Sequence, residues 1–162
     1  MHPTLSTGLF IGVLCGAWMF VMGFTGWYLD PAKVNRFFLV IVFEVAGLVW
    51  GLRKTAAEGR TYSGQVVAGT GMAIVAGLVI FCCSLLFTTV AFPNYLSDIN
   101  EMSRQMLLQQ GMPPEEVQRS LDANASSPAT NALSGFIGTF MTGVVASAVI
   151  SLWIKAPART QP

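Results

Sequence analysis

One carboxylate, Glu44, lies at the centre of an otherwise apolar stretch, FFLVIVFEVAGLVWGL, which runs from Phe37 to Leu52. Basic residues flank this stretch at both ends: Lys33, Arg36, Arg53 and Lys54. An apolar helix between basic clusters is typical of a membrane span, and an ionisable group near the middle of a span is a candidate functional site. Such a carboxyl could exchange a proton or bind a cation.

The partners of Glu44 must be sought among neutral groups. No other Asp, Glu, Lys, Arg or His lies within an apolar block, so a hydroxyl, an indole, water or a proton would have to pair with it. Burial without a cation favours the neutral acid, and we therefore expect Glu44 to be often protonated. Thr142 and Trp18 are expected at about the same depth on neighbouring antiparallel helices. The candidate proton or ion site in the membrane is therefore Glu44, Thr142 and Trp18.

Other reactive residues do not suggest a site. Cys15, Cys82 and Cys83 all lie inside apolar blocks, whereas a structural zinc site needs spaced sets of Cys and His. The only histidine, His2, is next to the N-terminus. The spans hold no nucleophile with a base and no paired carboxylates. We therefore expect no metal, no cofactor and no enzymatic activity.

The composition is that of an integral membrane protein. Hydrophobic residues make up 53% of the 162 residues and charged residues only 10%, and the mean hydropathy is +0.59. Soluble domains carry about 25% charged residues. The formal net charge of +1 and the absence of a long basic run argue against nucleic-acid binding. The expected surroundings are the lipid bilayer.

Four apolar blocks predict an all-α, polytopic protein in which residues 1–162 form a single membrane domain. The four transmembrane helices are expected at about residues 5–29, 33–53, 64–92 and 132–154. Between the first two, Asp30 is expected as the N-cap of the second span and Pro31 as its first helical residue. Trp27 and Tyr28, at the end of the first span, are typical of an interfacial aromatic belt.

Small residues recur at every fourth position of these helices, which lets helix backbones approach closely. The pattern indicates a glycine zipper within a four-helix bundle. On the second span, Glu44 shares a face with two glycines and should point toward neighbouring helices rather than lipid. For the first span, packing within the chain is favoured over a homodimer seam. The expected packing or dimer ridge comprises Gly8, Gly12, Gly16, Gly47, Gly51, Gly69, Gly77, Gly135 and Gly143.

Residues 93–130 are polar and predict an amphipathic helical hairpin between the third and fourth spans. A first helix is expected from Asn94 to Gln110, ended by Gly111. Pro114 and the acids that follow it predict the start of a second short helix. Acids outnumber arginines in this segment. It therefore lacks the basic polar face of a sensor for anionic lipids.

The basic residues suggest an orientation. With the N-terminus inside, five basic residues lie inside and four outside. The inner ones are Arg53, Lys54, Arg60, Lys155 and Arg159. Three of these share one compact loop, which should weigh more than basic residues spread over a long segment. We predict that both termini are cytoplasmic and that the hairpin is extracytoplasmic.

The chain resembles the bacterial membrane family called domain of unknown function 4199. The resemblance rests on the basic loop GLRKTAAEGRTYSGQ, the glycine-rich helix after it, and FPNY at the exit of that helix. It continues through GMPPEEVQ in the acidic segment and a final span of small residues ending in a basic tail. The resemblance implies a four-helix protein of a bacterial inner membrane. The family has no assigned activity, so no functional residue can be carried over.

Two functions remain open. The favoured one is a structural or interaction component, a scaffold or accessory subunit, in which Glu44 is a neutral hydrogen-bonding residue and the hairpin meets a partner. The alternative is a small proton- or cation-coupled transporter, or a transporter subunit, that uses Glu44. No inverted repeat is evident, and four helices enclose little volume, so transport would require dimerisation. A homodimer and a complex with another membrane protein are both open.

Overall fold

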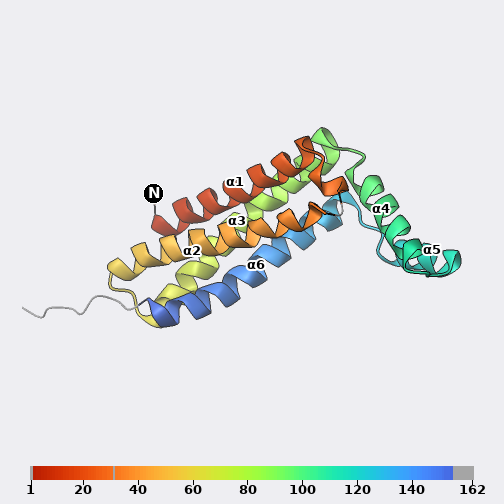
Figure 1. Cartoon of the computed structure of the whole chain (residues 1–162). Helices are drawn as coiled ribbons and strands as arrows, with labels where there is room; N and C mark the ends of the chain where they lie inside the picture. The colour runs from red at the N-terminus through yellow and green to blue at the C-terminus, as the bar shows by residue number, and fades with distance from the viewer. Residues whose placement is uncertain (1, 31, 155–162) are drawn as a thin grey trace, which may run out of the picture.

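The computed structural model describes residues 2–30 and 32–154, and every regular element within them is a helix. The long helices are α1 (Pro3–Phe24), α2 (Leu39–Ala57), α3 (Tyr62–Leu86) and α6 (Pro128–Trp153). They lie side by side (Figure 1). Each of these four helical stretches is long and apolar enough to cross a membrane. The structure therefore confirms the expected all-α fold with four helices that could span a membrane.

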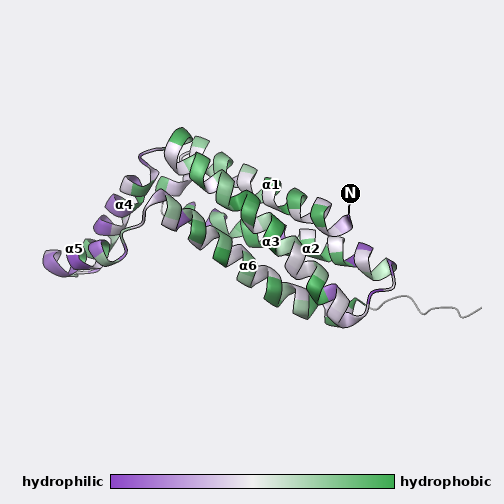
Figure 2. Cartoon of the chain, turned by 180° about the vertical axis from the view of Figure 1, so that it is seen from behind, coloured by the Kyte–Doolittle hydropathy of each residue, from purple (hydrophilic) through white to green (hydrophobic). Residues whose placement is uncertain are grey.

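Shorter helices connect the long ones. Three are single turns or little more: η1 (Trp27–Leu29), η2 (Val34–Phe38) and η3 (Phe87–Ala91), the last a π-helix that continues α3. Two others, α4 (Tyr95–Gln109) and α5 (Pro114–Ala123), project from one end of the long helices (Figure 1). Figure 2 shows the long helices as mainly hydrophobic and α4 and α5 as mainly hydrophilic.

Helix α3 is the central element. It packs against α1, α2 and α6, while α2 also packs against α1 and α6. The core where they meet comprises Ile11, Cys15, Leu48, Met72 and Ala76. Large apolar side chains also cover the outward faces, where Val67 and Val149 are more than half exposed. Lipid tails can solvate such faces, whereas a soluble protein would bury them.

The glycines of α1 pack against α3. A Cβ on Gly8 would lie 2.6 Å from the carbonyl oxygen of Met72, and one on Gly12 would lie 2.6 Å from Cβ of Val79. Gly16 is equally close to α3. Only a residue without a side chain fits at such distances. This ridge is covered within the chain, so it is not a free seam for a second copy.

The other expected ridge glycines also lie at helix contacts. Gly47 and Gly51 of α2 face α1, Gly69 and Gly77 of α3 face α6, and Gly143 of α6 faces α3. Gly135 is the loosest of the set, because the nearest atom to its added Cβ is 3.6 Å away, on Ile80.

The first two helix boundaries differ from expectation. Helix α1 ends at Phe24 rather than at residue 29, because Gly26 adopts φ +67° and turns the chain. The helical backbone of the second span begins at Val34, and Lys33 rather than Asp30 occupies its N-cap position. Asp30 instead accepts a hydrogen bond from the backbone N–H of Ala32 at 2.9 Å. Pro31 lies outside the described residues.

The helices of the polar segment follow the prediction closely. The expected helix from Asn94 to Gln110 is confirmed as α4, and Gly111 ends it with φ +81°. The second short helix is confirmed as α5, which begins at Pro114. Val117 of α5 is buried, and α5 packs against α4.

The start of α1 and the end of α6 lie at the same end of the molecule, opposite α4 and α5 (Figure 1). The α2–α3 loop is at this end too, since the side-chain amide of Gln65 donates to the carbonyl oxygens of Arg60 and Ile154. Lys155 and Arg159, which entered the orientation argument, lie outside the described residues.

Candidate functional site

Glu44 lies on the buried face of α2 and is only 3% exposed. Gly47 and Gly51 are buried on the same face, as the spacing predicted. Opposite the carboxyl stands Gly143 of α6, where an added Cβ would lie 3.1 Å from Oε1 of Glu44. The missing side chain on α6 therefore makes the space that the carboxyl occupies.

Oε1 of Glu44 has no hydrogen-bonding partner among the described residues. A buried polar atom without a partner costs about 1 to 3 kcal/mol, and more when it is charged. On translocon scales, placing an acid in the middle of a span costs roughly 2.5 to 3.5 kcal/mol, which is another measure of the same loss of hydration. The fold therefore keeps a buried carboxyl oxygen of Glu44 that none of the described side chains pairs, although this costs free energy.

Glu44 lines a cavity of about 390 Å³ that is bounded by α1, α2, α3, α4 and α6. Most of the lining is apolar, and its aromatic members include Phe37 and Phe38 at the start of the second span. Glu44 is the only charged residue in the lining, among the described residues. The polar members of the lining are Glu44, Ser84, Tyr95, Asn131, Ser134, Thr139 and Thr142.

Of the two expected partners of Glu44, only Thr142 lines this cavity. Trp18 is placed elsewhere, because its indole N–H donates to the carbonyl oxygen of Arg36 at 3.1 Å. Arg36 precedes Glu44 by eight residues, which is about 12 Å of helix rise. The Trp18 ring lies beside Phe43, the neighbour of Glu44, with 5.6 Å between ring centroids. Its N–H nevertheless bonds to Arg36, and the expected hydrogen bond to Glu44 is not formed.

Sequence reasoning missed two polar residues at the other end of the cavity. Asn131, in the first turns of α6, donates through its side-chain amide to Oγ of Ser84 at 3.2 Å. Tyr95, the first residue of α4, reaches the cavity from outside the long helices. Neither stood out in the sequence, since Tyr95 belongs to the polar segment 93–130 and Asn131 lies between that segment and the expected fourth span.

Tyr95 and Asn131 also line a second cavity, of about 420 Å³, between α4, α5 and the start of α6. This cavity is mixed in character, with Ile99 and Leu121 beside Ser103. The linings of the two cavities therefore share Tyr95 and Asn131, and these two side chains lie between the α4–α5 side and the Glu44 cavity.

Aromatic contacts and one hydrogen bond hold α4 in this position. The hydroxyl of Tyr28, in η1, donates to Oδ2 of Asp98 in α4 at 3.1 Å. The ring of Tyr95 lies 5.0 Å from that of Tyr28 and 5.1 Å from that of Phe87, between centroids. Burial and the bond to Asp98 raise the pKa of Tyr28, and burial raises the pKa of Tyr95. Both phenols are therefore neutral near pH 7.

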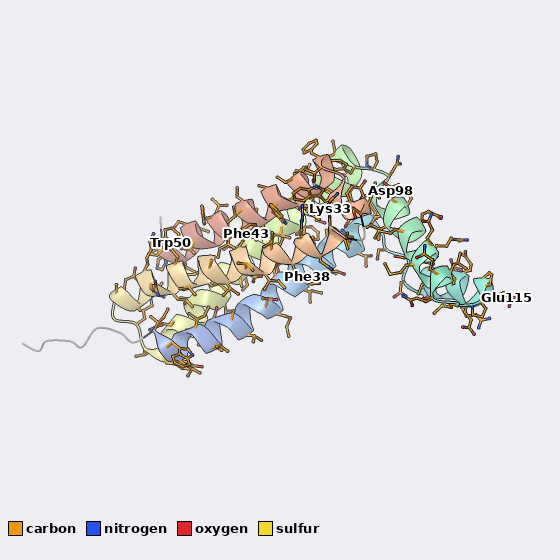
Figure 3. All side chains as sticks on the ribbon, viewed as in Figure 1. Lys33, Phe38, Phe43, Trp50, Asp98 and Glu115 are labelled. Atoms are coloured by element: carbon orange, nitrogen blue, oxygen red, sulfur yellow. The ribbon has the colours of Figure 1, made fainter. Side chains whose placement is uncertain are left out.

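Helices α4 and α5 carry an excess of negative charge. Asp98 lies near the long helices and Glu115 near the far tip of this unit (Figure 3). Arg104 bonds to Gln118 of α5 and lies 3.9 Å from Glu101. Between residues 95 and 123, five acids stand against two arginines: Asp98, Glu101, Glu115, Glu116 and Asp122 against Arg104 and Arg119.

A second group of buried polar atoms lies toward the opposite end of the long helices. The side-chain oxygens of Thr7, Ser147 and Ser151 and Oε1 of Gln65 have no partner among the described residues. Ser147 fits against Gly69. Together with Thr139, these serines continue a weakly polar face along α6 on both sides of the level of Glu44.

A family model with the description "Protein of unknown function (DUF4199)" matches residues 6–156 of the chain. No curated protein and no solved structure matches it. The comparisons therefore assign neither an activity nor a functional residue, and the chemistry must be argued from the Glu44 cavity itself.

Proposed function

This chain belongs to the DUF4199 family of proteins of unknown function, and we propose that it is a small transporter, or the transporting subunit of a larger one, in which Glu44 binds and releases a proton or a cation. The observation that carries the proposal is that Glu44, whose Oε1 has no partner among the described residues, lines a cavity. A carboxyl that served only to hold helices together would have its partner within the fold.

A second feature of the cavity favours transport over a role in which Glu44 only packs between closed helices. Its hydroxyls and amide continue from Thr142 past Thr139 toward Asn131 and Tyr95, at the α4–α5 end. Ionisable residues inside a membrane that face such a cavity commonly mark ion and substrate pathways. In this proposal α4 and α5 cover one end of such a pathway.

The surroundings are proposed from the sequence. The protein spans the inner membrane of a bacterium, with both termini in the cytoplasm and α4–α5 outside. We expect it to act without a cofactor and to catalyse no reaction, and the described lining of the cavity holds no histidine or lysine that would activate a nucleophile.

A scaffold or accessory role is the second candidate function, and the exposed surface of helices α4 and α5 favours it. Helices α4 and α5 stand clear of the long helices, and Met106 and Leu108 of α4 are each 42% exposed. Such a surface could meet another membrane protein or a second copy of the chain. In that case the Glu44 cavity would be closed to water and solutes.

Carbodiimide labelling separates the two functions. A hydrophobic carbodiimide reacts with a protonated carboxyl in an apolar setting, and mass spectrometry locates the adduct. With the protein in bilayer discs, we expect Glu44 to be labelled and the labelling to fall as the pH rises through the neutral range. The other titratable groups facing Glu44 in the cavity are Cys15 from α1 and Tyr95 from α4, and neither ionises there near pH 7.

Glu58→Gln is the matched control, since Glu58 is exposed in the α2–α3 loop and, among the described residues, forms an ion pair with Arg60 alone. It should leave the labelling of Glu44 unchanged, whereas Glu44→Gln should abolish it. If intact wild-type protein shows no adduct on Glu44 at any pH, the cavity is sealed and the transporter proposal fails.

A further inference from the structure

We propose that the Glu44 cavity binds a monovalent organic cation with an apolar body, such as a quaternary ammonium compound. This inference rests on the proposed function and names its substrate class. The cationic head would lie against the carboxylate of Glu44, and the body would extend toward α4.

The positive charge of the proposed ligand is inferred from the charge of the residues that line the cavity. Glu44 is the one charged side chain among the described lining residues, and its free Oε1 is buried. An anionic ligand would meet no cation there. A small inorganic cation would need several oxygen ligands to replace its water, whereas most of this lining is apolar. A single diffuse positive charge on an apolar group requires only the one carboxylate.

The apolar part of the proposed ligand is inferred from the length of the cavity and from the aromatic side chains that line it. Phe38 precedes Glu44 by six residues, which is about 9 Å of helix rise. Phe37, Phe38 and Tyr95 all line the part of the cavity away from Glu44. An apolar body about as long as a benzyl group and its ammonium centre would reach these rings. Aromatic faces also attract quaternary ammonium groups that pass them.

The charge of α4 and α5 favours cations on the way in. Helices α4 and α5, which line the second cavity, carry five acids and two arginines, and this cavity shares Tyr95 and Asn131 with the first. A net negative surface around an opening raises the local concentration of cations. The same surface would repel an anion of equal size.

Binding would exchange one charge for another. The organic cation replaces the acidic proton of Glu44, which leaves to water, so the carboxylate is neutralised both before and after. Because a quaternary ammonium does not titrate, any pH dependence of its binding belongs to the protein. Cys15 and Tyr95 are the other titratable groups in the lining, and both stay neutral near pH 7. Binding should therefore strengthen as the pH rises.

Protection from carbodiimide tests the inference on the wild-type protein. The probe is benzyltrimethylammonium, and its control is neopentylbenzene, the neutral compound of the same shape in which carbon replaces the nitrogen. We expect benzyltrimethylammonium to reduce the labelling of Glu44 and neopentylbenzene to leave it unchanged. If Glu44 is labelled but the two compounds protect equally, or neither protects, the cation inference is overturned and the proposed function stands. If Glu44 is never labelled, both are overturned.

Binding of radiolabelled benzyltrimethylammonium then tests the role of Glu44 directly. Its affinity should fall about tenfold or more in Glu44→Gln, which corresponds to losing 1.4 kcal/mol or more of binding. Glu44→Asp keeps the charge and should retain part of the affinity, and Glu58→Gln should bind as the wild type does. Equal affinity in Glu44→Gln and the wild type would overturn the inference, and the protection experiment decides the matter if Glu44→Gln does not fold.

Discussion

The contact between Glu44 and α6 depends on one residue without a side chain. An added Cβ at Gly143 would overlap Cβ of Ala73 on α3 and would come within 3.1 Å of Oε1 of Glu44. Helices α2, α3 and α6 therefore meet around the carboxyl, and the space for it exists only because position 143 is glycine. The site and the packing of the helices share this residue.

Gly143→Ala should destabilise the protein by about 1 to 3 kcal/mol, because overpacking a tight interface forces neighbours to shift. Gly138→Ala is the matched control on the same helix, since nothing lies within 4 Å of its added Cβ. Alanine there should be neutral or stabilising by up to about 1 kcal/mol through helix propensity. Thermal unfolding in detergent measures both, and equal shifts in Tm would contradict the assigned packing.

At the scale of elements, α4 is attached to the long helices by few contacts. The π-helix at the end of α3 leads into an aromatic group in which Phe87, Phe92 and Tyr95 pack together. The hydrogen bond between Tyr28 and Asp98 then ties α4 to η1. Loosening α4 would move Tyr95, which lines the Glu44 cavity.

Tyr28→Phe should loosen α4 while leaving the long helices intact. It removes the hydroxyl that donates to Asp98, a bond worth roughly 1 kcal/mol. Hydrogen exchange of the α4 amides should therefore become faster. Tyr62→Phe is the matched control, because its hydroxyl donates instead to Ala148 in α6. If both variants change α4 equally, the bond to Asp98 does not hold it.

High pH should have the same effect as Tyr28→Phe. The folded protein holds the pKa of Tyr28 above its ordinary value of about 10, so it favours the protonated phenol. The contribution of this bond is complete below about pH 10 and is lost as the pH rises through the folded-state pKa. Relative to the intrinsic exchange rate at each pH, the protection of the α4 amides should therefore fall above about pH 10 in the wild type and show no such step in Tyr28→Phe.

The whole molecule has two unlike ends. One holds the beginning of α1, the α2–α3 loop and the end of α6, and the other holds the acidic α4–α5 unit (Figure 1). Four long helices separate them. The geometry thus requires the α2–α3 loop and α4–α5 to face opposite sides of a membrane that all four helices cross.

Cysteine labelling tests this arrangement and its orientation. Ala125→Cys places a thiol on an exposed residue after α5, and Glu58→Cys places one in the exposed α2–α3 loop. A maleimide that does not cross membranes should label Ala125→Cys in intact cells and Glu58→Cys only after the membrane is opened. The unmodified chain corrects for its native cysteines. Labelling of Glu58→Cys alone in intact cells would reverse the orientation, and labelling of both would contradict the fold.

Much of the fold could be predicted from the sequence because membrane spans follow local composition. Long apolar blocks, helix-ending glycines and the capping pattern of the polar segment are local features, and they located the long helices, α4 and α5 to within a few residues. The second span ends later than expected, at Ala57, and the fourth begins earlier, at Pro128. The largest error lies at the turn around Gly26 and Asp30, where a short stretch of 3₁₀ backbone replaces the expected helix ends. Such a turn depends on what it packs against.

The sequence by itself determined that Glu44 is buried and on which face of α2, since both follow from hydropathy and the helical period. Only the tertiary structure decided its neighbours. Trp18 bonds to Arg36 instead, whereas Asn131 and Tyr95, far away in the chain, come to line the cavity of Glu44. Which residues meet depends on the depth and rotation of whole helices. Those are set by backbone approach at many glycines at once, which no single local pattern specifies.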